Sequence, residues 1–581
     1  MPDAFLFEPV TTEPAHLLEI ERATGTFSLK TPRPGSFRSS EGIEEIFGLI
    51  GIIRLLAGPY LVVITARKRV GRLLGCDVWR VTGTKLLPFV KGRLHTERQR
   101  DEERYLALLQ SILKGGHLYY STHYDLTHRA QKQHALRDDH QDKPMWERAD
   151  QRFFWNRYLA QDFISSQLDG WVTPVMLGYV QIESHCTVNG HRFDYALISR
   201  RHTKRAGTRY HIRGADEQGH VANFVETEQV LVVPAQDRIY SFVQTRGSIP
   251  VFWSQAPDIT YKPKPRLTAT EKRNAAAFKA HMDDLTRHYS RHVLINLINH
   301  KGAEAVIGKE YEKQVQLYGD ESVRYVWFDF HHECRKMRFE NVSNLIQQVK
   351  PEIEQFGYFL TENNEAVRKQ EGVFRTNCID NLDRTNVVQS TLAREVLNAQ
   401  LLHAGVFQRP SESIADHPAF RQIFNHVWAN NADAISEQYA GTGALKTDYT
   451  RTGKRSFKGV LNDGLNSATR YYLNNFKDGF RQDAYDLFLG NYVVGQSPRS
   501  PFAHNYRPVA TTLFVIALLI GVVMLLASVV APILQPEGTQ SIIYQFMVIV
   551  FWAVAMVGAY RVLKLYGRDL VDRPQLVPIP H

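Results

Sequence analysis

Cysteine is scarce in this sequence: the 581 residues include only Cys76, Cys186, Cys334 and Cys378. Four scattered cysteines are too few for a disulfide framework, and no two have the close spacing of a zinc knuckle. The amino terminus also lacks the basic start and apolar run of a secretory signal. These absences favour a reducing compartment and predict that the bulk of the chain stays in the cytosol.

The chain has no excess of acidic residues. Lysine and arginine number 70 against 60 aspartates and glutamates, which gives a formal charge of +10. A positive chain suits an anionic partner such as a membrane surface, a phosphate ester or nucleic acid. With 44% hydrophobic residues, the chain can bury a large core and should divide into two or more domains.

Two long apolar runs stand near the carboxyl end. Residues 509–534 carry no charge, and residues 542–563 follow after the short polar segment QPEGTQS. About 20 such residues span the hydrocarbon core, so the runs predict a two-helix transmembrane hairpin. By the positive-inside rule, basic residues outside the connecting segment indicate that both flanks are cytosolic. These residues are Arg499, Arg507, Arg561, Lys564, Arg568 and Arg573.

A third apolar run, 46–65, is not expected to cross a membrane. Arg54 lies near its middle, and Gly58-Pro59 would break a helix there. We expect a short helix, a turn and a buried strand.

The remaining sequence indicates an α+β multidomain protein. Short apolar stretches such as YLVVITA and DVWRVTG predict a β-rich amino-terminal domain over 1–175. Helical periodicity in TATEKRNAAAFKAHMDDLTRHY and NVSNLIQQVKPEIEQF, interleaved with RYVWFDF, predicts an α/β domain over 176–488. Residues 489–508 are rich in Gly, Pro and Ser, so we expect a linker with an extended reach of about 60 Å. Residues 564–581 are expected to form a cytosolic tail.

The stretch FRTNCIDNLDRTNVVQ, 374–389, places Cys378 six positions before Arg384. In a phosphate-binding loop of this kind, backbone N–H groups surround the phosphate, the next helix presents its positive end, and the arginine clamps two oxygens. The same field favours a thiolate that can attack phosphorus. GVFR before Cys378 predicts a strand, and TNVVQSTLAREVLNAQLL predicts a helix with Thr385 or Asn386 as its cap.

Spacing alone is a weak signal, because Cys186 also has an arginine, Arg192, six positions on. There Asn189-Gly190 is typical of a β-hairpin turn, which would put Cys186 and Arg192 on neighbouring strands. We therefore expect a buried strand residue at 186 and the reactive cysteine at 378.

Chemistry suggests roles within the loop. Cys378 is the candidate nucleophile, and Arg384 is the group that holds the phosphoryl oxygens. Thr385 can donate a hydrogen bond to the sulfur or aid hydrolysis of the phosphocysteine. Either Asp383 or Asp380 must protonate the leaving alkoxide and then accept a proton from water. Asp383 is preferred because it adjoins Arg384, and one of the two can merely brace the loop.

Basic segments supply further candidates for substrate binding. SRRHTKRAGTRYHIR, 199–213, complements an inositol phosphate and anionic headgroups, and a solvated basic face explains it equally well. GTGALKTDYTRTGKRSFKG, 441–459, is expected to be a mobile loop. HHEC, 331–334, is expected on a strand, where adjacent side chains cannot converge on an ion, so we expect neither metal nor cofactor. The candidate substrate-binding residues are Asn377, Asn381, Arg384, Lys204, Arg205 and Arg209.

With these residues in place, RTNCIDNLDRTN, 375–386, resembles the signature of the Sac (suppressor of actin) family of phosphoinositide phosphatases. Blocks such as YYSTHYDLT, RGSIPVFWSQ and WFDFHHECRKM extend the resemblance over most of the chain before the hairpin. The hairpin is similar to that of the integral-membrane type found in endoplasmic reticulum and Golgi. The resemblance implies a β-rich Sac domain packed on a cysteine-phosphatase domain. It also implies hydrolysis of phosphatidylinositol 4-phosphate, with phosphatidylinositol 3-phosphate as a lesser substrate.

Other functions stay open at this point. A protein tyrosine phosphatase can use the same cradle, and a catalytically weak scaffold can use the loop to bind headgroups. The presence of Cys378 and Arg384 argues against a scaffold, because binding needs no activated thiol. Asn381 stands where some Sac relatives have cysteine, which removes a redox partner for Cys378. Nucleic-acid binding explains the charge but not the hairpin. The expected partners are a phosphoinositide, an anionic membrane surface and a membrane-protein complex of lipid metabolism that the sequence does not identify.

Overall fold

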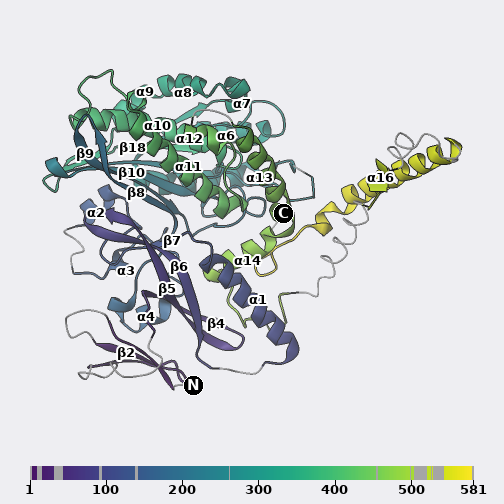
Figure 1. The fold of residues 1–581 in the computed structure, drawn as a ribbon, viewed down its shortest axis with the longest axis horizontal. Helices are drawn as coiled ribbons and strands as arrows, with labels where there is room; N and C mark the ends of the chain where they lie inside the picture. Colours follow the sequence, from purple (N-terminus) through teal and green to yellow (C-terminus); the bar gives the residue numbers. More distant parts are fainter. Residues whose placement is uncertain are drawn as a thin grey trace.

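The computed structural model describes residues 3–9, 16–31, 44–90, 94–137, 142–260, 262–452, 456–497, 499–502, 520–521, 523–524, 526–527 and 542–578. Figure 1 shows a body in which the amino-terminal strands lie at one end and the helix-rich half at the other, with α16 (Ile542–Leu570) projecting from it. Strands and helices are both abundant, so the predicted mixed α and β composition is confirmed.

Thirteen of the described strands form one sheet. Eleven follow the order β15-β14-β18-β11-β10-β9-β8-β7-β6-β5-β4, and β16 and β17 extend from β11. The pairings from β4 to β11 are antiparallel, whereas β11, β18, β14 and β15 are parallel. The strands are β4 (Gly48–Leu55), β5 (Gly58–Leu73), β6 (Cys76–Pro88), β7 (Leu118–Tyr120), β8 (Met176–Val188), β9 (His191–Arg201), β10 (Val225–Val233), β11 (Arg238–Arg246), β14 (Arg291–Asn296), β15 (Val323–Trp327), β16 (Phe359–Glu362), β17 (Glu365–Arg368) and β18 (Gly372–Asn377).

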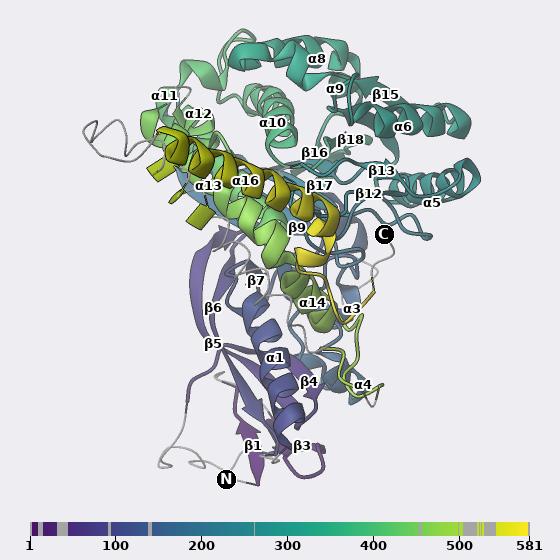
Figure 2. The ribbon, with the colours of Figure 1, turned by 90° about the vertical axis from the view of Figure 1, so that its right-hand side faces the viewer.

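Helices cover both faces of the parallel part of this sheet. Successive strand residues point to opposite faces, so Phe374 joins one core with α8, α10 and α11, and Val373 joins another with α5 and α6. Figure 2 shows α5 and α6 on one side of these strands and α10 and α11 on the other. This is the three-layer arrangement of an α/β domain. The helices are α5 (Glu271–Tyr289), α6 (Ala305–Tyr318), α7 (Phe330–Glu333), α8 (Val342–Gln348), α9 (Lys350–Phe356), α10 (Asp383–His403) and α11 (Pro418–Ala440).

The amino-terminal half packs differently. A small sheet of β1 (Ala4–Phe7), β2 (Leu17–Glu21) and β3 (Phe27–Lys30) lies beside β4 and β5, and α1 (Thr96–Leu113) packs against α14 (Asp478–Phe488). The boundary predicted at residue 175 falls immediately before β8, which pairs with β7 on one side and β9 on the other. The sheet therefore continues through that position. Shorter elements are α2 (Ala130–Leu136), α3 (Met145–Arg148), α4 (Gln161–Ser165), β12 (Trp253–Ser254) and β13 (Arg266–Leu267).

The apolar segment 46–65 does not contain the predicted short helix. It forms β4 and the first part of β5, joined by Leu56-Ala57. Both faces of β4 are buried, with Ile53 in one core and Ile52 in another, so the period-two pattern of a strand is hidden in a continuous apolar run. Arg54 is exposed and pairs with Asp162 at 2.9 Å.

The predicted linker, 489–508, is not an extended tether over its described residues. The Tyr492 and Tyr105 hydroxyls lie 3.3 Å apart, and the Phe502 ring lies 4.8 Å from that of Tyr105. Residues 571–578, in the predicted tail, also return to the body, where the Leu576 backbone N–H donates to Asp483 at 2.9 Å. Aromatic and aliphatic burial against α1 and α14 explains why these Gly- and Pro-rich segments are held.

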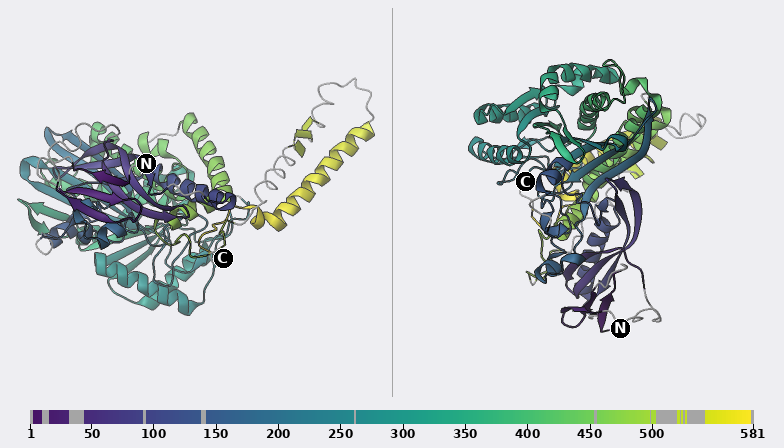
Figure 3. Two further views of the ribbon diagram at one scale, coloured as in Figure 1. Left: turned by 90° about the horizontal axis from the view of Figure 1, so that it is seen from below. Right: turned by 90° about the vertical axis from the view of Figure 1, so that its left-hand side faces the viewer.

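Most of the first predicted span, 509–534, lies outside the described residues. The second, 542–563, falls within α16, which Figure 3 shows extending away from the body. Among the described residues, no helix has both the length and the hydropathy that a membrane span requires.

Candidate active site

The strand, loop and helix predicted around Cys378 are present. β18 ends at Asn377, Cys378 follows it, and α10 begins at Asp383. Neither Thr385 nor Asn386 caps this helix, because α10 begins at Asp383, before both residues. Its cap position, Leu382, makes no side-chain cap hydrogen bond. The first N–H groups of a helix without a side-chain cap remain available to an anion.

Parallel pairing sets the position of the loop. β14 and β18 end together, with Asn296 opposite Asn377, and the Leu297 backbone N–H donates to the Asn377 carbonyl at 2.8 Å. The loop therefore starts at the carboxyl edge of the parallel strands. Ligands of open α/β sheets bind at this edge.

The loop backbone is shaped as an anion cradle. Asn381 adopts a left-handed conformation with φ of 55°, and its Oδ1 accepts a hydrogen bond from the Cys378 backbone N–H at 3.1 Å. Among the described residues, none accepts a hydrogen bond from the backbone N–H groups of residues 379–382. Buried N–H groups normally have partners, and a turn with a left-handed residue gathers such groups around an anion.

Arg384 lies on the wall of a cavity of about 730 Å³ that Cys378 also lines. Its two Nη atoms donate to the two carboxylate oxygens of Glu304, each at 3.1 Å, and Nη1 also donates to the Leu297 carbonyl at 3.1 Å. Burial lowers the pKa of Arg384, but its attraction to Cys378 and Glu304 is stronger, so the net shift is upward. The guanidinium stays charged beside the sulfur.

Asp380 is clamped by two arginines. Its Oδ2 lies 2.6 Å from Arg209 Nη2, and its Oδ1 lies 2.5 Å from Arg213 Nη2. Burial raises the pKa of Asp380, but Arg209 and Arg213 outweigh it and hold the pKa well below its usual range. A carboxylate fixed in this way stays ionised and braces the loop.

The pKa of Asp383 is shifted in the opposite direction to that of Asp380. Burial raises the pKa of this carboxyl, and the attraction of Arg470 and a hydrogen bond from the Leu445 backbone N–H, 3.0 Å away, only partly offset that effect. Both aspartates line the cavity beside Cys378. Two carboxyls whose environments move their pKa values apart are suited to different roles, and the raised one to proton donation.

Thr385, Asn377 and Asn381 support the loop from behind. Thr385 is fully buried in the first turn of α10, and its hydroxyl has no hydrogen-bond partner among the described residues. The Asn377 side chain donates to Asn296 Oδ1 at 2.8 Å. These three do not belong to the cavity wall, unlike Cys378. Asn377 and Asn381, which were predicted to bind substrate, therefore lie outside the cavity wall.

The basic segment 199–213 is mostly structural. Arg200 is buried and pairs with Glu226 at 3.0 Å and Glu228 at 2.7 Å. Arg205 Nε donates to the Gly214 carbonyl at 3.0 Å, and Lys204 is exposed away from the cavity wall. Lys204 and Arg205 are therefore not placed as predicted. Arg209 alone of the three candidates from this segment lines the cavity, where it pairs with Asp380 of the loop.

Residues 444–447 and 450 line the cavity, in the segment 441–459 where a mobile loop was predicted. This segment includes α12 (Thr447–Thr452) and the start of α13 (Phe457–Phe476). Arg451 Nη2 pairs with Asp433 at 2.9 Å, and this ion pair ties α12 to α11. The cavity rim carries exposed cations from several segments, namely Lys262, Lys264, Arg335, Lys336 and Lys446.

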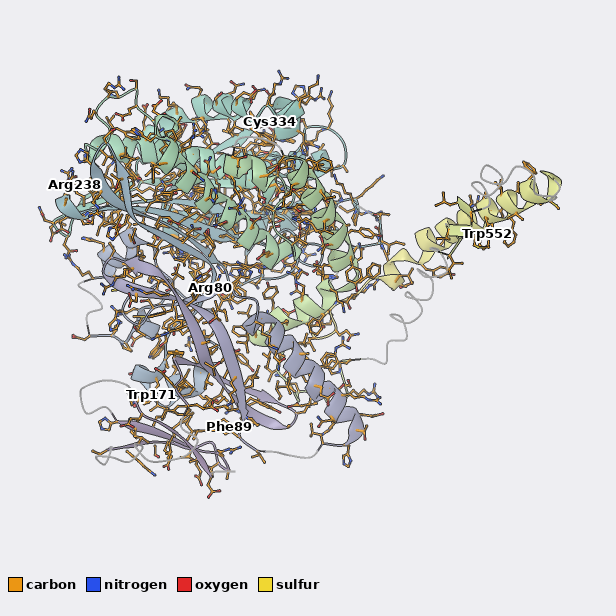
Figure 4. The ribbon with its side chains drawn as sticks, viewed as in Figure 1. Arg80, Phe89, Trp171, Arg238, Cys334 and Trp552 are labelled. Atoms are coloured by element: carbon orange, nitrogen blue, oxygen red, sulfur yellow. The ribbon has the colours of Figure 1, made fainter. Side chains whose placement is uncertain are left out.

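Residues 331–334 were predicted to lie on a strand, and this prediction is wrong. Residues 331–333 belong to the short helix α7, and Cys334 follows it. Among the described residues, no group of three or more histidines, cysteines or carboxylates is arranged to hold a metal ion. Cys334 lines the cavity, and Figure 4 shows it near the end of the helix-rich half. Cys186 is buried on β8 opposite Phe193, as the hairpin turn predicted.

Three important neighbours of the loop were given no role of their own from the sequence. Glu304 precedes Arg384 by 80 residues, and Arg213 meets Asp380 from a separate loop. Arg246 lies in the block RGSIPVFWSQ, and its Nη2 lies 3.4 Å from Asn386 Oδ1. Burial lowers the pKa of Arg246 to about 9, opposed by its attraction to Cys378. Only tertiary contacts reveal these three roles.

Comparison with known proteins identifies the family of this chain. Residues 47–335 match the SacI homology domain family. Phosphatidylinositol-3-phosphatase SAC1-B of Danio rerio is 42% identical over 542 residues, which cover 92% of this chain and 90% of the relative. Phosphatidylinositol-3-phosphatase SAC1 of Drosophila melanogaster is 41% identical over 589 residues, with coverage of 99% and 96%. Phosphoinositide phosphatase SAC7 of Arabidopsis thaliana is 38% identical over 582 residues, with the same coverage. The chain belongs to the Sac family of phosphoinositide phosphatases.

Proposed function

We propose that this chain is a membrane-anchored phosphatase that removes the 4-phosphate of phosphatidylinositol 4-phosphate through a phosphocysteine, with lesser activity on phosphatidylinositol 3-phosphate. The observation that carries the proposal is the position of Cys378. It lies at the amino end of α10, beside Arg384 and two carboxyls of opposite electrostatics, in a cavity with a cationic rim. An anionic ester fits this environment.

In the first step, the Cys378 thiolate attacks phosphorus. The sulfur–phosphorus bond forms while the bond from phosphorus to the inositol oxygen breaks, and protonated Asp383 gives its proton to that oxygen. Arg384, the loop N–H groups and the α10 terminus stabilise the charge on the phosphoryl oxygens. A proton donor at this point typically contributes about 10²–10⁴-fold.

In the second step, water attacks the phosphocysteine. Ionised Asp383 takes a proton from the water as the oxygen–phosphorus bond forms. The sulfur–phosphorus bond then breaks, so inorganic phosphate leaves and the thiolate returns. Asp380 does not exchange protons in this scheme, because Arg209 and Arg213 keep it ionised.

Two observations support a lipid headgroup as substrate. The cavity of about 730 Å³ lies within the usual range of about 300–1,000 Å³ for small-molecule sites. Relatives from animals and plants are named for hydrolysis of phosphoinositides, two of them for the 3-phosphate. Selectivity for the 4-phosphate is part of the proposal.

The anchor is proposed on the apolar segments 509–534 and 542–563, with cytosolic flanks in endoplasmic reticulum and Golgi membranes. Large apolar side chains of α16 are exposed, including Phe546, Phe551 and Val554, and Figure 4 shows Trp552 on α16 well away from the body. Alkaline carbonate extraction of membranes tests the anchor. Release of the full chain into the supernatant would contradict it.

Phosphate release from each of the seven phosphoinositides, in micelles with EDTA, tests the chemistry and the selectivity. We expect the highest rate on phosphatidylinositol 4-phosphate, and no measurable rate for Cys378→Ser. Cys186→Ser is the matched control, since this cysteine is also buried and also has an arginine six positions on. Equal rates for wild type and Cys378→Ser would remove the mechanism. Comparable turnover of phosphotyrosine peptides would favour a protein tyrosine phosphatase.

A further inference from the structure

Helix α13 has two unlike sides. One side belongs to the catalytic cavity: Arg470 and Asn474 are buried there and line it. Arg470 Nε donates to Thr442 Oγ1 at 3.0 Å, and Asn474 Nδ2 donates to the Ala440 carbonyl at 3.1 Å. These bonds fix α13 against the end of α11.

The other side of α13 exposes large apolar side chains to solvent. Their positions follow helical spacing, which aligns them along one stripe. We call these five residues the α13 stripe: Phe457, Val460, Leu461, Leu465 and Tyr472, exposed by 86%, 51%, 65%, 66% and 51%. Single exposed apolar residues are ordinary, but a contiguous row of them marks a surface that meets an apolar phase.

Helix α13 lies on the side of the body from which α16 projects, as Figures 1 and 2 together show. Two contacts join the helices through one segment. The Tyr471 hydroxyl of α13 donates to the Ile259 carbonyl at 2.6 Å, and Gly567 of α16 lies against the backbone of Asp258. The base of the apolar helix α16 and the helix that carries the α13 stripe therefore contact neighbouring residues of the body.

Charge next to the stripe indicates the nature of the partner. Lys458 is exposed beside Phe457 in the first turn of α13, and the exposed cations of the cavity rim, Lys446 and Lys336 among them, lie on the same cavity that α13 lines. Apolar side chains bordered by lysines are typical of helices that lie in the interface of an anionic bilayer. A protein partner would not require this combination to adjoin a lipid-binding cavity.

We propose that the α13 stripe inserts into the interface of an anionic bilayer and holds the mouth of the catalytic cavity against it. The inference deepens the proposed function, on which its catalytic consequence rests, while the insertion itself can be measured without catalysis. α13 then couples substrate lipid to Cys378, because one side of the helix lies in the membrane interface and the other side lines the cavity.

Fluorescence of a labelled stripe residue tests insertion independently of activity. Leu461→Cys in a full chain with Cys76→Ser, Cys334→Ser and Cys378→Ser carries an environment-sensitive nitrobenzoxadiazole label. The labelled chain is reconstituted into phosphatidylcholine vesicles with or without phosphatidylserine. We expect a blue-shifted emission that nitroxide-bearing lipids quench, more strongly with phosphatidylserine. Leu317→Cys is the matched control, a leucine 57% exposed on α6, and its emission should stay unquenched. Equal behaviour at the two positions would overturn the proposal.

Activity on two forms of one substrate tests the catalytic consequence. The variant Phe457→Ser/Leu461→Ser/Leu465→Ser should hydrolyse long-chain phosphatidylinositol 4-phosphate in vesicles at least about tenfold more slowly, since it loses the apolar burial of three side chains. Its rate on dissolved dioctanoyl phosphatidylinositol 4-phosphate should match wild type, and Leu317→Ser should match wild type on both. A loss on both substrates, or on neither, would contradict the inference.

Two further outcomes separate the hypotheses. If wild type hydrolyses neither substrate, the proposed function fails and the fluorescence alone decides insertion. If the label at 461 becomes shielded only as the density of protein in the vesicles rises, a second copy covers the stripe and the proposal is overturned. Should the triple variant not fold, Leu461→Asn alone carries the activity comparison.

Discussion

Arg384 and Glu304 form an ion pair with two parallel hydrogen bonds, although 80 residues separate them in the chain. This pair fixes the plane of the guanidinium before any phosphate arrives. A bidentate arrangement gives an arginine both a direction and a charge. Glu304 is therefore a positioning residue for the proposed phosphate clamp.

Glu304→Gln should lower kcat/KM by about 10- to 100-fold, since a hydrogen bond to a charged group contributes about 1.5–3 kcal/mol. We expect most of the loss in kcat, because the arginine still carries its charge but loses its orientation. Glu304→Asp should recover part of it. Steady-state kinetics on micellar phosphatidylinositol 4-phosphate measure the split, with exposed Glu321→Gln as control. An unchanged kcat would contradict the positioning role.

Asp383→Asn should lose more activity on a substrate whose leaving group needs a proton than on one whose leaving group does not. We expect a loss of about 10²–10⁴-fold on the lipid, whose alkoxide needs a proton. The loss should be much smaller on para-nitrophenyl phosphate, whose phenolate leaves unaided. Because the pKa of Asp383 is raised, its protonated form persists to higher pH, so the alkaline fall in the rate of the first step should begin at higher pH than an ordinary aspartate allows. Equal losses on both substrates would remove the proton-donor role.

Asp380→Asn should unfold more easily, because it leaves Arg209 and Arg213 without a counter-charge. Removing one partner of a buried ion pair costs about 3–5 kcal/mol. The pKa of Asp380 is lowered in the folded chain, so its stabilisation is present above the ordinary value of about 3.9 and is lost as pH falls through the folded value. Chemical denaturation at neutral and acidic pH should show the wild-type advantage shrinking in acid. A constant difference would contradict this assignment.

Asp483→Asn should flatten the pH dependence of stability between about pH 4 and 7. Burial raises the pKa of Asp483 to about 7. A folded value above the unfolded one gives stability that is present at low pH and lost as pH rises, by at most about 4 kcal/mol here. Hydrogen exchange of residues 571–578 reports the effect, since Asp483 accepts hydrogen bonds from Gln575 and Leu576. Exposed Asp237→Asn is the control. Identical pH profiles for wild type and Asp483→Asn would overturn the prediction.

Two exposed lysines should differ in their effect on substrate affinity. Lys264 lies on the cavity wall, whereas Lys204 does not. Lys264→Gln should raise KM for vesicle-borne lipid a few-fold, because it removes about 1 kcal/mol of attraction to an anionic surface. Lys204→Gln should leave KM unchanged. The difference in KM between the two variants should vanish at high salt. A larger effect of Lys204→Gln would contradict this prediction and support Lys204 as a substrate-binding residue, as the sequence predicted.

Local sequence features predicted the local structure of the site well. The apolar residues around Cys378 identified β18 and α10, and Asn189-Gly190 identified the hairpin that separates Cys186 from a cradle. Signature residues also identified the family, which the relatives confirm. These features depend on short-range patterns of hydrophobicity and turn chemistry.

Tertiary contacts account for what the sequence did not predict. Whether an arginine in segment 199–213 contacts substrate depends on which carboxylate or carbonyl the fold places beside it, as the contrast of Arg200 with Arg209 shows. The strand character of 46–55 was hidden because both faces of β4 are buried. Glu304 could not be found, since nothing in the sequence relates it to Arg384.

Tyr492 and Phe502 on one side, and Leu576 on the other, join the hydrophobic core between α1 and α14, which also contains Tyr105. The segments on both sides of the proposed membrane anchor therefore contact one core of the body. Contacts on both sides of the proposed anchor restrict rotation of the body relative to it. Once the proposed anchor is inserted, the body would keep a constant tilt relative to the membrane. It would then meet substrate in one leaflet at a rate set by the lateral diffusion of the lipid.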